Sequence, residues 1–149
     1  MMSLAINLNL ERRQQAQHLV SELRQERHEV WSLYCQIAEL KPFSNNTNIK
    51  LIMKQFAELL VDYVSLGHFG IYERLLSGTE RRQRVLTEAD SFYPEFSQTT
   101  EDVVTFNDRY DPGNRKLDYQ HLETDLSKLG ESLAKRMEIE DKLCALLLK

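Results

Sequence analysis

The sequence predicts an all-α fold, an antiparallel four-helix bundle with additional short helices. Only three prolines and five glycines interrupt its 149 residues, which favours few, long helices. Apolar residues recur at spacings of three and four along most of the chain, and no strand-like alternation is sustained. A chain of this length is expected to form one domain, residues 1–149.

The first long helix is predicted over residues 10–40. Its apolar stripe contains Ala16, Leu19, Leu23, Val30, Tyr34 and Ile37. At about 100° per residue, Arg27 falls inside this stripe rather than opposite it. Pro42 and the polar residues after it end the helix, and Asn46 or Thr47 can cap the next one.

The second helix is predicted to reach Leu66, within the stretch LVDYVSLGHFGIYERLL (residues 60–76). Gly67 is expected to permit the left-handed turn that commonly closes a helix. A short third helix is then predicted over residues 69–76, so the stretch is interpreted as two helices separated by a break.

Two further helices are predicted in the second half of the chain. Residues 80–90 are highly charged and indicate a short solvent-facing helix with Val85 and Leu86 turned inward. Pro94 suits the first turn of the next helix, which is predicted to run to Tyr110.

The last helix is predicted from about Leu117 to the C-terminal end of the chain, after a turn at residues 111–113. Its apolar stripe contains Leu122, Leu126, Leu129, Leu133, Met137, Cys144 and Leu147. Glu140 lies within about 40° of the centre of this stripe. Because a lone buried carboxylate is costly, Glu140 is expected to be buried and paired with a cation.

Arg27 is the first candidate partner, because it occupies the matching anomalous place on the first helix. Arg136 (one turn away), Arg74 and His68 are the other candidates. We interpret Arg27, Arg74 and Glu140 as structural buried charges rather than as ligand-binding or catalytic groups.

The net charge indicates which class of partner to expect. A charge of −4 argues against direct nucleic-acid binding, which normally needs a basic face, and suits a basic partner better.

The cysteines and the apolar runs bear on the compartment. Cys35 and Cys144 form no ligand pattern, which favours a reducing compartment. No signal peptide and no run of about 20 apolar residues is present, so a cytoplasmic protein without membrane contact is expected.

The chain is not expected to be an enzyme. It lacks the Glu-x-x-His pairs of di-iron bundles, a glycine-rich phosphate loop and a Gly-x-Ser-x-Gly elbow, so no metal or cofactor is expected. A phosphotransfer role for His68 is an alternative, although its neighbours Phe69 and Gly70 are not typical of such sites.

Binding is the remaining function, and the second helix offers a surface for it. Its polar face contains Gln55, Glu58, Asp62 and Ser65. Glu58 and Asp62 are like charges one turn apart, which is consistent with a basic partner, although an ordinary hydrated face explains the same pattern.

The stretch LVDYVSLGHFGIYERLL resembles the signature of the Rsd/AlgQ family, bacterial regulators that bind the primary sigma factor of RNA polymerase. A second block, LSKLGESLAKRMEIEDKL (residues 126–143), and the Leu-Lys-Pro at residues 40–42 are also similar to the family. The matching blocks lie in register along most of the chain, apart from the first ten residues and residues 81–90.

The resemblance implies an anti-sigma factor that acts as a monomer without a cofactor. Family members bind the C-terminal domain of the primary sigma factor, and the implied mechanism is occlusion of its contacts with promoter DNA and core polymerase. The partner-binding residues are then expected to be Glu58, Asp62, Ser65, Leu66, Phe69 and Tyr72. The alternative is a helical scaffold for another regulatory protein.

Overall fold

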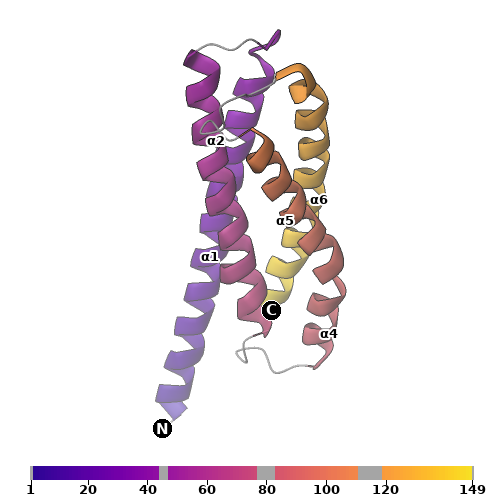
Figure 1. Ribbon diagram of the computed structural model, residues 1–149. Helices are drawn as coiled ribbons and strands as arrows, with labels where there is room; N and C mark the ends of the chain where they lie inside the picture. The colour runs from indigo at the N-terminus through magenta and orange to yellow at the C-terminus, as the bar shows by residue number, and fades with distance from the viewer. Residues whose placement is uncertain (1, 44–46, 77–82, 111–118, 149) are drawn as a thin grey trace.

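The structure, a computed structural model, describes residues 2–43, 47–76, 83–110 and 119–148. These residues are almost entirely helical and contain no strand, which confirms the predicted all-α class. Four long helices lie side by side and alternate in direction (Figure 1): α1 (Met2–Ala38), α2 (Thr47–Ser65), α5 (Tyr93–Arg109) and α6 (Leu122–Leu148).

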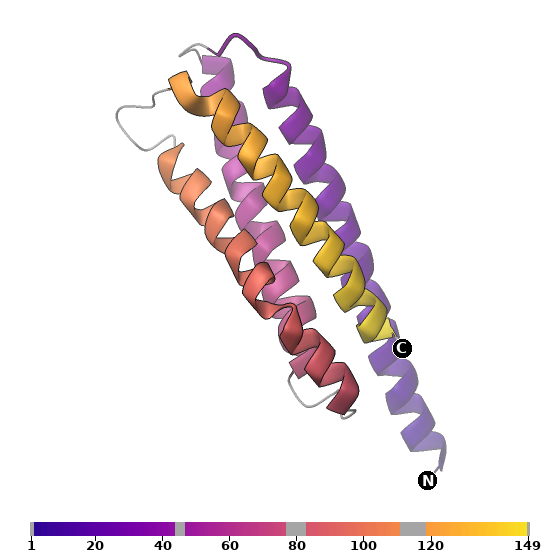
Figure 2. The same cartoon turned by 90° about the vertical axis from the view of Figure 1, so that its right-hand side faces the viewer.

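The four long helices enclose one core. Helix α1 packs against α2 and α6, and α5 packs against α6 and α2. The predicted stripe of α6 faces inward: all its members are buried except Leu147, which is half-buried. At its N-terminal end α1 projects past the other helices (Figure 2), and it begins at Met2 rather than near residue 10.

The predicted break at Gly67 is wrong. Helix α2 passes directly into a π-helical segment, η1 (Leu66–Tyr72), and then into the short helix α3 (Glu73–Leu76). The Glu73 amide donates to the carbonyl of His68, five residues earlier, so the wider turn continues the backbone hydrogen bonding. Gly67 therefore does not close a helix, and it is not in the left-handed conformation.

The short helix predicted over residues 80–90 is present, whereas the one predicted over residues 69–76 is not a separate helix. Helix α4 (Gln83–Ser91) buries Val85 and half-buries Leu86, and Pro94 lies in the first turn of α5. A single 3-10 turn, η2 (Tyr119–His121), precedes α6. The expected turn at residues 111–113 and the expected start near residue 117 lie outside the described residues. No helix in the described ranges has the length and apolar character needed to cross a membrane.

Candidate functional site

A cluster of buried charged groups lies in the middle of the bundle. Glu140 on α6 is fully buried, and its carboxylate accepts hydrogen bonds from three side chains. Arg136 donates through Nε at 3.1 Å, Arg27 donates through Nη2 at 3.3 Å, and the Tyr63 hydroxyl also donates. The acid is thus held by α1, α2 and α6 together.

Arg136 is the second centre of this cluster and is also fully buried. Its Nη1 donates to the hydroxyls of Thr99 (3.1 Å) and Thr100 (2.8 Å) on α5. Its Nη2 donates to the backbone carbonyl of Val64 on α2 at 3.2 Å. One guanidinium therefore joins α2, α5 and α6, and all three of its nitrogens are bonded.

The electrostatics follow from burial and pairing. Burial raises the pKa of the Glu140 carboxyl, while Arg136, Tyr63 and Arg27 act in the opposite direction. Burial likewise lowers the pKa of Arg136, and the nearby Glu140 opposes that shift. Because the groups are paired and enclosed on several sides, they are suited to fixing the helices relative to one another rather than to contacting a ligand.

Arg27 lies where its anomalous position in the stripe predicts, next to Glu140. It is mostly buried, with 18% of its side chain exposed, and its Nη1 also pairs with Asp141 at 2.8 Å. The sequence favours Arg27 over Arg136 as the partner of Glu140, whereas the structure shows both arginines pairing with it.

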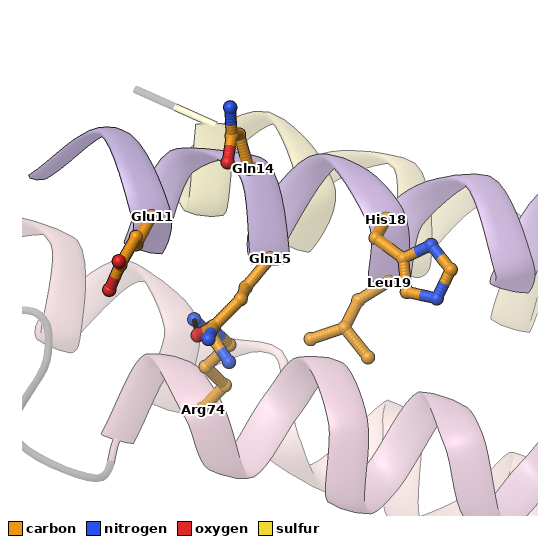
Figure 3. Close-up of a pocket in the computed structure, with 6 residues that line it drawn as sticks. All are labelled: Glu11, Gln14, Gln15, His18, Leu19 and Arg74. Carbon is orange, nitrogen blue, oxygen red and sulfur yellow. Dashed lines mark hydrogen bonds between the residues drawn. The ribbon is translucent and has the colours of Figure 1, made fainter. Parts of the chain in front are cut away.

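The prediction that Arg74 is a buried charge is wrong. It is half-buried at the surface of α3, where its Nη2 donates to Gln15 of α1 at 3.0 Å. This pair lines an open cavity of about 400 Å³, and Figure 3 shows the Gln15 and Arg74 side chains meeting there. Its lining residues are Glu11, Gln14, Gln15, His18, Leu19 and Arg74. Arg74 is separated from the cluster because Gly67, near the start of η1, lies against Glu140, whereas Arg74 follows the end of η1 in α3.

His68 is not a partner of Glu140 either. Its ring is stacked on Phe96 at 6.3 Å and on Tyr72 at 6.0 Å, and its Nε2 lies 3.7 Å from Glu73. These contacts leave His68 half-buried, with 31% of its side chain exposed, whereas a phosphotransfer histidine is presented openly on a helix surface.

The outer face of α2 and η1 carries five of the six expected partner-binding residues. Glu58 and Asp62 are exposed, Ser65 and Leu66 are half-buried, and Phe69 is 63% exposed. An exposed phenylalanine of this kind is a candidate anchor for a partner.

Tyr72 is the exception, and its assignment to this surface is wrong. It is only 3% exposed, and its ring stacks on that of Phe96 at 5.6 Å. The reason is the wider π-helical turn of η1, which rotates the chain less per residue than an α-helix and so brings Tyr72 into the bundle.

Sequence reasoning missed a row of acids on α1 that adjoins Asp62. Burial raises the pKa of Glu26, and the neighbouring Asp62, Glu29 and Glu22 raise it further. Asp62 therefore belongs to an acidic patch, defined here as Glu22, Glu26, Glu29 and Asp62, that spans α1 and α2. The spacing of the α1 acids, four and three residues apart, was the available sequence signal.

Metal ligation finds no support in the described residues. None of their His, Cys, Asp and Glu side chains gather in threes in a way that could hold an ion.

Comparison with known proteins relates the chain to one family of regulators. Residues 2–148 match the family described as "Regulator of RNA polymerase sigma(70) subunit, Rsd/AlgQ". A "Regulator of sigma D" from Yersinia enterocolitica is 31% identical over 134 residues, which cover 84% of this chain and 77% of that protein.

Two shorter matches carry the same name. The protein of Enterobacter sp. (strain 638) is 36% identical over 97 residues, 64% of this chain but only 58% of that relative. The protein of Escherichia coli O139:H28 is 34% identical over 97 residues, 64% of this chain and 61% of that relative. No solved structure matches the chain significantly.

Proposed function

The chain belongs to the Rsd/AlgQ family, and from this we propose that it is an anti-sigma factor that binds the C-terminal domain of the primary sigma factor. The observation that carries the proposal is the family match over residues 2–148. The protein then acts by binding alone, in the cytoplasm, as a monomer, with no cofactor and no contact of its own with nucleic acid.

The mechanism is occlusion. The partner domain is a helix-turn-helix module whose basic surface reads the promoter and which also docks on core polymerase. A regulator that covers both surfaces keeps the sigma factor from either contact. The net charge of −4 suits such a partner, because opposite charges speed encounter and select against acidic competitors.

The neighbouring surfaces of α1, α2 and η1 offer the two kinds of contact that this mechanism needs. The acidic patch opposes the basic recognition helix. The exposed Phe69, with Leu66 beside it in η1, supplies an apolar anchor of the kind that carries most of the energy in an interface. Glu58 and Ser65 complete the polar rim on α2.

The test is calorimetric titration of the chain with the isolated C-terminal sigma domain. Phe69→Ala should weaken binding by about 2 kcal/mol if this side chain is a central anchor. Asp62→Ala should weaken it by about 1 kcal/mol if the charge lies at the rim. Two exposed residues of α5 provide matched controls, Val104→Ala and Glu101→Ala, which should bind as wild type does.

Melting curves for the same four variants separate binding from folding, since exposed positions usually change stability by less than about 0.5 kcal/mol. Absence of binding by the folded wild-type chain would sink the proposal. A pull-down that returned a different regulatory protein would then favour the helical-scaffold alternative.

A further inference from the structure

The buried cluster lies directly against η1, the segment that carries the exposed Phe69. We propose that the Arg136–Glu140 pair of α6 holds η1 in its π-helical form and thereby positions Phe69 for partner binding. The binding part of this inference rests on the proposed function, whereas the effect on η1 itself does not. Arg136 and Glu140 are then positioning residues that never touch the partner.

The first observation is the close approach of Gly67 to the pair. A Cβ atom at this position would lie 2.7 Å from Oε2 of Glu140 and 3.1 Å from Nη2 of Arg136. Any side chain here would push η1 away from the carboxylate. Gly67 is therefore needed for contact between η1 and α6, not for a turn.

The second observation is that the residues leading into η1 are bonded to the same pair. The Val64 carbonyl accepts from Arg136, and the Tyr63 hydroxyl donates to Glu140. π-Helical turns are rare and are frequent at functional sites, so one that persists is expected to be held by specific contacts. Here those contacts come from α6.

The third observation is a path of ring contacts from the pair to the surface. The guanidinium carbon of Arg136 lies 4.1 Å from the centroid of the Phe96 ring. The Phe96 ring stacks with His68 at 6.3 Å, and His68 meets Phe69 edge to face at 4.9 Å. The rings of Phe96 and His68 thus connect Arg136 with the exposed Phe69.

The test replaces the buried network by apolar side chains of similar size, in the triple variant Tyr63→Phe/Arg136→Met/Glu140→Leu. Such replacements often preserve or raise stability, because no unpaired buried charge remains. Arg27 keeps Asp141, and both threonine hydroxyls keep the Phe96 carbonyl. The matched control, Glu138→Ala/Lys142→Ala, removes an exposed ion pair at the same spacing on α6.

Two measurements decide the outcome: titration with the sigma domain, and amide hydrogen exchange over residues 66–72 of the free protein. The triple variant should bind about tenfold more weakly, a loss of about 1.4 kcal/mol, and exchange faster in η1. The control should match wild type in both. A folded triple variant that binds and exchanges as wild type does would overturn the inference, because the pair would then only stabilise the core.

A second comparison covers the case in which the triple variant does not fold. Gly67→Ala inserts a methyl group against Glu140, whereas Gly130→Ala inserts one against the Tyr34 hydroxyl, away from η1. Both disturb helix packing, but only Gly67→Ala should speed exchange in η1 and weaken binding. Equal exchange over residues 66–72 in the two variants would count against the inference. If wild type does not bind the sigma domain, the proposed function fails. Amide hydrogen exchange over residues 66–72 then still tests whether the Arg136–Glu140 pair holds η1.

Discussion

At the scale of single residues, the fold depends on how Glu140 is satisfied. Three donors from three helices surround a carboxylate that has no contact with water. Burying these charges costs desolvation free energy, which their mutual pairing offsets. Removing one member therefore lowers the stability of the fold far more than replacing the whole set by apolar residues.

Glu140→Ala should therefore destabilise the protein by about 3–5 kcal/mol, because it leaves Arg136 buried without its carboxylate. Glu140→Gln should cost less, since an amide oxygen can still accept from Arg136 and Tyr63. Urea unfolding of both variants measures the difference. An unchanged unfolding midpoint for Glu140→Ala would show that the cluster contributes nothing to stability.

The two cysteines should differ sharply in reactivity. Burial, with Glu140 nearby, raises the pKa of the Cys144 thiol to about 11, whereas Cys35 is exposed. A thiol reagent reacts with the thiolate, so at about pH 8 Cys35 should be labelled in the native protein and Cys144 only after denaturation. Mass spectrometry after timed labelling checks this, with Cys35→Ser as the control that should take up no label while folded.

The Glu26 carboxyl should make stability depend on pH. Its pKa is raised in the folded state, so folding favours its protonated form, and its ionisation as pH rises above the ordinary carboxyl range destabilises the fold. Glu26→Gln should be slightly more stable than wild type at pH 7, within about 0.5 kcal/mol, and this advantage should fade toward pH 4. Thermal melts at both pH values test the sign; an advantage that grew on acidification would contradict it.

At the scale of elements, the helices follow from local pattern, while η1 does not. The stripes of α1 and α6 face the core as their spacing predicts, with only Leu19, Tyr34 and Leu147 half-buried, and Glu140 lies on the inward face of α6. Gly67 carries no local signal for a π-helical turn, because its role depends on α6 residues about 70 positions away. For the same reason the sequence predicts Tyr72 at the surface although it is buried, because the direction of its side chain depends on the π-helical turn before it.

The acidic patch likewise could not be predicted in full from the pattern of one helix. Asp62 could be identified from its own helix, but its neighbours come from α1, and only the packing of α1 against α2 brings the two together. Pattern within one helix predicts which face is polar. It does not predict which polar faces of different helices adjoin.

Helix α4 should be the least stable of the helices longer than one turn. It has nine residues and buries only Val85 and Ala89, whereas α6 buries eleven of its 27 residues. Regions with few buried apolar contacts open at lower free energy. Native-state hydrogen exchange should therefore show α4 amides exchanging well before those of α6. Protection of α4 equal to that of α6 would mean that it unfolds only with the whole bundle.

At the scale of the whole molecule, the surface proposed to bind a partner lies outside the buried core that holds the helices together. Its charged network lies inside, while the acidic patch and Phe69 lie on the outer face of two neighbouring helices and η1. Substitutions at the exposed positions of that outer face can thus alter the proposed recognition without removing core contacts.

Electrostatic steering by this face should be measurable as a rate of association with the partner. Asp62→Lys places a positive charge beside Glu26 on a surface proposed to meet a basic domain. Association with the sigma domain should slow most at low salt, because like charges then repel over a Debye length of about 30 Å at 0.01 M. The gap from wild type should narrow by 1 M salt, where the length is about 3 Å.

Stopped-flow association across a salt series tests this, with Glu101→Lys on α5 as the control of identical charge change. Both variants alter net charge by two, so any common slowing reports the charge of the whole molecule. The additional slowing in Asp62→Lys alone reports the position of the charge. Equal rates for the two variants at every salt concentration would place the basic partner elsewhere than on α1 and α2.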